Sequence, residues 1–114
     1  MSKELYLPLK KQWYEMIESG VKTEEYREIK PYWCKRIAYC RNNLCWFRDE
    51  NNECVFRDSL RNINRLNYTH IKFSYGYTKR TMTFEIESIT IGKGNTDWGA
   101  PNEDVFIIKL GRKI

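Results

Sequence analysis

The spacing of apolar residues changes once within the first twenty positions. Large apolar side chains alternate over residues 5–9, which predicts a β-strand, and Pro8 restricts that strand to a sheet edge or to a strand end. From Lys10 the spacing becomes helical, with four apolar residues on one face: Leu9, Trp13, Met16 and Ile17. Gly20 stands where a left-handed C-terminal cap would end this helix, because glycine enters that conformation without a side-chain clash.

The stretch that follows is polar on both of its predicted faces. Residues 21–29 are expected to be extended, and alternate side chains of an extended chain share a face. The pattern therefore divides the stretch into two sets: Thr23, Glu25 and Arg27 on one face, and Lys22, Glu24, Tyr26 and Glu28 on the other. Pro31 can begin a short helix that runs to Ile37. A second short helix is expected over residues 57–66, with arginines spaced four apart.

The C-terminal part of the chain alternates like β-structure. Residues 70–77 and 82–91 predict two antiparallel strands joined by a turn over 78–81, and residues 105–110 predict a last strand. The polar loop between the last two strands contains Trp98. A strand, a helix and then several antiparallel strands, with no internal repeat or linker, predict one α+β domain over residues 1–114, a small barrel whose ends are covered by helices.

Charge adds a surface to this picture. The 114 residues carry 20 Lys and Arg against 15 Asp and Glu, a formal charge of +5, and the excess lies in residues 57–80. Neutralising phosphates releases condensed counterions, so such a cluster favours a polyanion. We expect a nucleic-acid approach surface made of six residues: Arg57, Arg61, Arg65, Lys72, Lys79 and Arg80. The alternative is a helix face that is merely solvated.

Several classes of protein are disfavoured by what the sequence lacks. No apolar run approaches the roughly 20 residues that cross a bilayer, and residues 1–4 carry no apolar signal segment, so a cytoplasmic protein without a membrane partner is expected. The four cysteines form no C-x-x-C pair and His70 is the single histidine, which argues against a metal or a Ser-His-Asp triad. No cofactor is expected, and the oligomeric state stays open.

The residues with the most chemistry lie together at positions 20–27, G-V-K-T-E-E-Y-R. Lys22 and Arg27 supply cationic donors, and Glu25 can accept from both, which would orient them toward an anion or a base edge. The alternative is a salt bridge between Glu25 and Arg27 that only closes one end of the barrel. Three aromatic residues of the predicted strands and helices, Tyr26, Trp33 and Tyr75, are expected to be buried.

The pattern G-x-K-x-x-E-x-R, after a strand ending in Lys10 and one helix, resembles the ASCH domain, a family related to the PUA domain. The resemblance covers the first 30 residues and extends to the strands near 84–91 and 105–110. It provides no counterpart for residues 38–67, which are interpreted as a family-variable insertion that includes the basic helix.

The resemblance implies a small PUA-like, mostly antiparallel β-barrel with two or three short helices. It also implies a cleft that binds RNA or a modified nucleotide or nucleoside. Together with the loop that holds Trp98, it predicts five ligand-binding residues: Lys10, Lys22, Glu25, Arg27 and Trp98. Trp98 would form a wall of the cleft or, alternatively, plug the end of the barrel.

Two other functions remain as hypotheses. One ASCH subfamily resembles this chain and hydrolyses N4-acetylcytidine, which implies an amidohydrolase of acylated nucleosides with Lys22, Thr23 and Glu25 as candidate catalytic residues. In that subfamily, however, a threonine stands at the position of Glu25, and Thr23 is expected to point away from Lys22. The third hypothesis is a protein-interaction domain.

Overall fold

A single curled sheet organises the part of the chain that the structure, a computed structural model, describes: residues 3–37 and 68–114. Its elements are β1 (Glu4–Leu9), α1 (Lys11–Glu18), β2 (Glu24–Glu28), α2 (Pro31–Ile37), β3 (His70–Tyr75), β4 (Thr81–Lys93), the 3₁₀ turn η2 (Thr96–Trp98) and β5 (Asp104–Lys113). The strand order is β1-β3-β4-β5-β2. Strand β1 runs parallel to β3, and the other three pairings are antiparallel.

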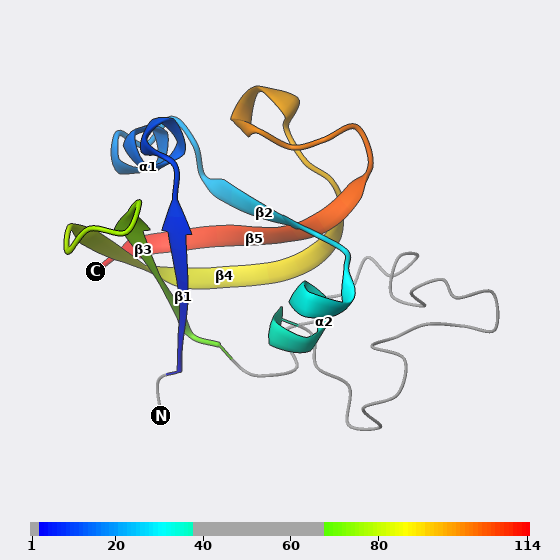
Figure 1. Cartoon of the computed structure of the whole chain (residues 1–114), viewed down its shortest axis with the longest axis horizontal. Coiled ribbons are helices and arrows are strands. Elements are labelled where there is room, and N and C mark those ends of the chain that lie inside the picture. Colours follow the sequence, from blue (N-terminus) through cyan, green and yellow to red (C-terminus); the bar gives the residue numbers. More distant parts are fainter. Residues whose placement is uncertain (1–2, 38–67) are drawn as a thin grey trace, which may run out of the picture.

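The two longest strands give the sheet its curl. The register of β4 and β5 shifts near Phe84, Ile86 and Ser88, and such irregularities bend a strand and increase its twist. Figure 1 shows β4 and β5 curving behind β1 and β2, with α1 at one end of the curl and α2 at the other. The expected α+β fold, small and barrel-like, is thus confirmed. Strand β1 is an edge strand, as Pro8 predicts.

The first helix buries a face that differs slightly from the predicted one. Lys10 is its N-cap, and its carbonyl accepts hydrogen bonds from the amides of Trp13 and Tyr14. Tyr14 and Ile17 are the buried residues, whereas the predicted Trp13 and Met16 are half-buried. Tyr14 packs edge-on against Tyr75, with ring centroids 5.2 Å apart, so the helix turns a ring toward β3.

Two apolar clusters hold the elements together. The larger fills the inside of the curl with side chains from β1, α1, β3, β4 and β5, among them Leu5, Leu7, Ile17, Phe73, Ile91 and Phe106. The smaller consists of Tyr26, Ala100 and Val105, with Trp98 and Ile107 packed against it. It fixes the loop between β4 and β5 onto β2.

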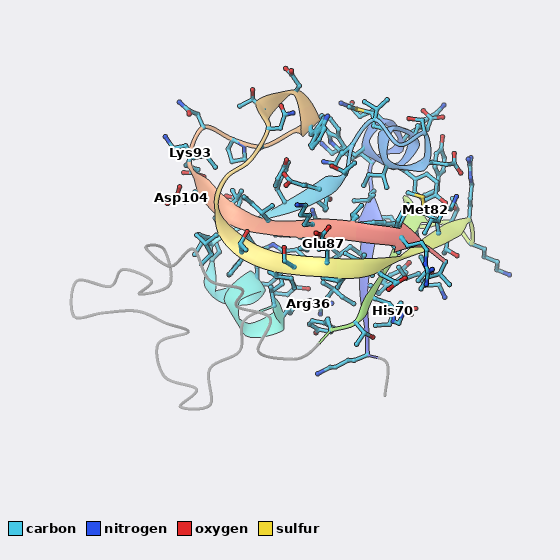
Figure 2. The ribbon with its side chains drawn as sticks, turned by 180° about the vertical axis from the view of Figure 1, so that it is seen from behind. Arg36, His70, Met82, Glu87, Lys93 and Asp104 are labelled. Atoms are coloured by element: carbon cyan, nitrogen blue, oxygen red, sulfur yellow. The ribbon has the colours of Figure 1, made fainter. Side chains whose placement is uncertain are left out.

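Several predicted boundaries are wrong. Strand β4 runs to Lys93 and β5 begins at Asp104, because Gly92 continues the antiparallel register instead of ending it. Figure 2 shows Lys93 and Asp104 side by side. Strand β3 ends at Tyr75, because Gly76 turns the chain with a φ of 59°. The predicted helix over 57–66, Arg57, Arg61, Arg65 and three of the cysteines lie outside the described residues.

Candidate functional site

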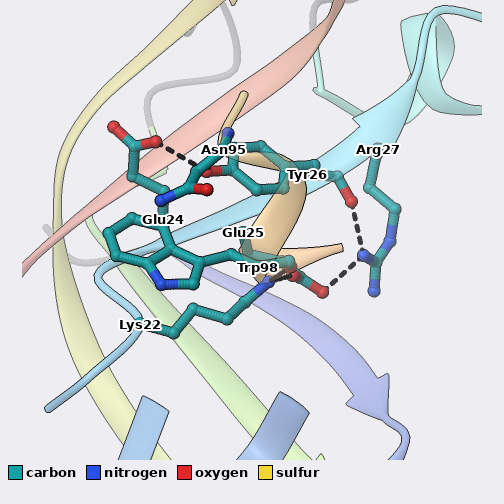
Figure 3. Close-up of polar contacts among 7 residues, drawn as sticks. All are labelled: Lys22, Glu24, Glu25, Tyr26, Arg27, Asn95 and Trp98. Atoms are coloured by element: carbon teal, nitrogen blue, oxygen red, sulfur yellow. Dashed lines mark hydrogen bonds and ion pairs between the residues drawn. The ribbon is translucent and has the colours of Figure 1, made fainter. Parts of the chain in front are cut away.

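Glu25 joins the two cations of the motif. One carboxylate oxygen lies 2.9 Å from Nζ of Lys22, and the other lies 2.5 Å from Nη1 of Arg27. Glu25 is 4% exposed and Lys22 is 2% exposed, so this ion pair is removed from water. Figure 3 shows the three side chains meeting at the carboxylate. Burial of this kind is tolerated only when each charge has close partners.

The Lys22 ammonium is held by several partners inside the protein. It donates to the backbone carbonyl of Trp98 at 2.5 Å, in addition to Glu25. The rings of Trp13 and Tyr26 each lie 5.0 Å from Nζ, close enough for cation–π attraction. Lys22 therefore anchors the loop between β4 and β5 to the start of β2.

The predicted division of residues 21–29 into two faces is wrong at Lys22. Alternation would place Lys22 and Glu25 on opposite faces, yet they form an ion pair. The reason is that β2 begins at Glu24, so Lys22 lies before the strand, where its own amide donates to the carbonyl of Met16 in α1. Side-chain alternation holds only within a strand.

Arg27 is the member of the group that reaches solvent. Its side chain is 18% exposed, and Nη1 donates both to Glu25 and to the carbonyl of Tyr26, the latter at 2.6 Å. The guanidinium lies over the ring of Trp33, 5.1 Å from its centroid. Among the described residues, Nε and Nη2 have no hydrogen-bond partner. One edge of the guanidinium is thus fixed, and other donors are left for a ligand.

A cleft of about 580 Å³ opens beside Arg27. Its charged and aromatic side chains come from the start of α1, from β2, from α2 and from the loop before β5: Lys10, Tyr26, Arg27, Glu28, Trp33 and Glu103. Gly99 and Pro101 complete the loop side. A volume of this size suits a small molecule or one unit of a polymer.

The predicted ligand-binding residues divide into two groups. Lys10 and Arg27 line the cleft, whereas Lys22 and Glu25 lie buried behind it. Trp98 packs against the smaller apolar cluster and holds Lys22 through its carbonyl, and the following residue, Gly99, lines the cleft instead. The side chain of Trp98 is therefore not a wall of this cleft.

Sequence reasoning missed Trp33 as a cleft residue. It is half-buried instead of enclosed, and it contributes both to the larger apolar cluster and to the cleft. Glu28 and Glu103 were also missed. For Trp33 the sequence did contain a usable signal, its short distance along the chain from the motif arginine, Arg27. A strand that leads directly into a helix places the side chains of these two residues next to each other.

The candidate catalytic residues are only partly brought together. Lys22 and Glu25 are paired, but Thr23 is exposed and does not line the cleft. Its backbone carbonyl accepts from the amide of Leu110, which ties this position to β5. Within residues 3–37 and 68–114, the Thr23 hydroxyl is not hydrogen bonded to Lys22.

Three of the six residues of the predicted nucleic-acid approach surface lie in the part of the chain that the structure describes. Lys79 is exposed, Lys72 is half-buried on β3, and Arg80 is held by Glu18 of α1 at 2.8 Å and stacks on Tyr75. Arg80 thus has a structural partner of opposite charge.

The hydroxyl of Tyr26 links β2 to the loop between β4 and β5. Its hydroxyl donates to Glu24 Oε1 at 2.8 Å and accepts from the amide of Asn95 at 3.0 Å, as Figure 3 shows for the first of these bonds. Burial, the strongest influence, raises the pKa of Tyr26, and the hydrogen bond to Glu24 raises it further.

We therefore expect Tyr26 to make the protein sensitive to alkali. Its folded-state pKa lies above the unfolded value of about 10, so its stabilising effect is complete below that pH and is lost as the pH rises above it. The free energy of unfolding should fall above pH about 10, and less steeply in Tyr26→Phe. Urea titrations of both proteins across this range measure the difference, and equal slopes would contradict the assignment.

Metal sites, membrane-spanning helices and similar proteins were each searched for. In the described part of the chain, no group of three or more His, Cys, Asp and Glu side chains could hold a metal ion. The helices described there are also too short or too polar to cross a membrane. Comparison with models of protein families, with curated proteins and with solved structures found no match.

Proposed function

We propose that this chain is an ASCH-like domain of the PUA-like class that binds a nucleobase, either of RNA or of a free or modified nucleoside or nucleotide, in the cleft beside Arg27. The observation that carries the proposal is the guanidinium itself. It is fixed through Nη1, lies over Trp33 and keeps Nε and Nη2 without partners among the described residues. A planar ligand with a carbonyl acceptor suits such a site.

The charges around the cleft favour a base over a phosphate. Lys10 and Arg27 bring two positive charges, and Glu28 and Glu103 bring two negative ones. A site for several phosphates would be cationic overall, because each phosphate needs compensation. Neutral bases combine carbonyl acceptors with amino donors, and a rim of both signs can satisfy both.

The aromatic side chains support the same ligand class. Tyr26 and Trp33 both line the cleft, and proteins that recognise unpaired bases commonly stack them on such rings. The buried group of Lys22 and Glu25 serves as a support, because it orients Arg27 before any ligand arrives. Motif residues that do not touch the ligand thus still determine the site.

The proposal is tested by binding of the four common ribonucleosides, N4-acetylcytidine and short single-stranded RNA, followed by calorimetry. We expect at least one to bind, and Arg27→Gln to weaken it about 10- to 100-fold, the effect of losing hydrogen bonds to a charged donor. Lys109→Gln is the matched control, because Lys109 is exposed on β5 and lies 3.7 Å from Glu87. Absence of binding, or equal effects of the two variants, would refute the proposal.

The same samples separate binding from catalysis. Release of acetate from N4-acetylcytidine, abolished by Lys22→Ala, would show an amidohydrolase instead of a binding domain. Thermal unfolding of each variant must be measured alongside, because Lys22 is buried and its loss affects the fold.

A further inference from the structure

The turn between β3 and β4 presents an aromatic ring to solvent. Tyr77 is 95% exposed, the highest value among the large apolar side chains of the described residues; the next, Ile114, is 66% exposed. A ring this exposed contributes little to the core; its immediate neighbours along the chain are Gly76 and Thr78, and Lys79 follows. Exposed aromatic rings beside a cation are what unpaired bases stack on.

The turn that carries Tyr77 is held firmly. The Gly76 amide donates to the carbonyl of Leu9 at 2.8 Å, and the Ser74 hydroxyl donates to the carbonyl of Gly76 at 2.6 Å. Thr78 Oγ1 donates to the carbonyl of Tyr75 at 2.6 Å. A base that stacks on Tyr77 would therefore not have to order the backbone first, which lowers the cost of binding.

The turn is hydrogen bonded to the chain directly before a cleft residue. Leu9, which accepts the bond from Gly76, is followed directly by Lys10, a residue that lines the cleft. Figure 1 shows the turn beside α1, at whose start Lys10 lies. A nucleic-acid strand with one base in the cleft could therefore reach the turn with a neighbouring nucleotide.

The surroundings favour nucleic acid over a protein partner. The residues that follow Tyr77 in the chain, Thr78 and Lys79, are exposed and are polar and basic, whereas sites that dock proteins are typically contiguous apolar patches. Lys79 is exposed, and no described acidic side chain pairs with it, whereas Arg80 is already paired with Glu18. An available cation beside a ring matches a phosphate next to a stacked base.

We infer that Tyr77 and Lys79 form a second contact for single-stranded nucleic acid, Tyr77 stacking on a base and Lys79 facing a phosphate of the strand whose other base occupies the cleft. The inference rests on the proposed function and extends it from a single nucleoside to a strand. Lys79 should then add salt dependence to the binding of a strand, because it displaces a counterion.

The experiment compares two probes on the full chain: a single ribonucleoside and a fluorescent single-stranded oligonucleotide of mixed sequence, measured by calorimetry and anisotropy. Tyr77→Ala should weaken oligonucleotide binding about five- to a hundredfold and leave nucleoside binding unchanged. Tyr77→Phe, which keeps the ring, should bind like the wild type. Lys79→Gln should reduce the salt dependence, and Lys113→Gln, an exposed control on β5, should not.

The outcomes distinguish this inference from the proposed function. Weakening by Arg27→Gln but not by Tyr77→Ala would overturn the second contact and leave the cleft in place. Weakening by Tyr77→Ala but not by Arg27→Gln would support the turn and overturn the cleft. A protein that binds nucleosides but no oligonucleotide would overturn the inference as well. Circular dichroism of each variant checks the fold, which the exposed positions of Tyr77 and Lys79 should preserve.

Discussion

Replacing Glu25 with alanine is expected to lower the free energy of unfolding by about 3–5 kcal/mol. The variant leaves the ammonium of Lys22 in the protein interior without its carboxylate, with the neutral Trp98 carbonyl and two aromatic rings as its remaining partners. An uncompensated buried charge is among the most destabilising changes that a single substitution can make. Urea denaturation at neutral pH measures the loss.

Two companion variants make this prediction specific. Glu28→Ala removes an exposed carboxylate that lies 3.0 Å from Lys30, and it should cost less than about 1 kcal/mol. Adding Lys22→Met to Glu25→Ala should recover part of the loss, because the buried charge is then absent. A loss below about 1 kcal/mol in Glu25→Ala would mean that Lys22 reaches water, contrary to its buried position.

Gly94→Ala is expected to destabilise the protein by about 2–3 kcal/mol. A Cβ at this position would lie 2.5 Å from Tyr26 Cε1 and 2.8 Å from the Cβ of Ala100, far closer than carbon atoms approach. Neither neighbour can yield easily, because both belong to the smaller apolar cluster and Tyr26 is hydrogen bonded to the Asn95 amide. The loop must move, and ligand binding in the cleft should weaken together with stability.

Gly92→Ala is the matched control for this loop. Its Cβ would meet Ile107 Cδ1 at 3.6 Å, an ordinary contact, and Gly92 lies within β4. The change in stability should therefore stay within about 0.5 kcal/mol. Thermal unfolding of the two variants compares them, and equal stability would show that the loop does not rest on Tyr26 as described.

Elements determined by local spacing were predictable. Alternation identified the first strand, a proline placed it at an edge, and Gly20, with a φ of 88°, ends the first helix as expected. Strand ends were less predictable, because cross-strand pairing carried β4 through Gly92 to Lys93. Pairing partners are remote in sequence, so local composition contains little information about them.

The candidate site was predictable in its residues but not in its arrangement. Glu25 does lie between Lys22 and Arg27, yet Lys22 is closed off by the carbonyl of Trp98. A backbone carbonyl is present at every position, so no side-chain pattern marks this one as the partner of a lysine 76 residues earlier. The depth of each residue below the surface, which separates Arg27 from Lys22, likewise depends on tertiary packing.

The pairing of the two edge strands constrains when the molecule can fold during its synthesis. Strand β1 cannot pair until β3 has been made, as the hydrogen bond between Lys3 and Thr69, 66 residues apart, illustrates, and β2 cannot pair until β5 has been made, the most C-terminal of the described strands. Leu5 and Leu7 have no sheet to cover them until β3 has been made, and Tyr26 has none until β5 has been made. Contacts so remote in sequence slow folding and lengthen the time during which apolar segments can associate with other chains. Premature termination before residue 104 would therefore yield a chain with neither β2 nor the Lys22 ion pair in place.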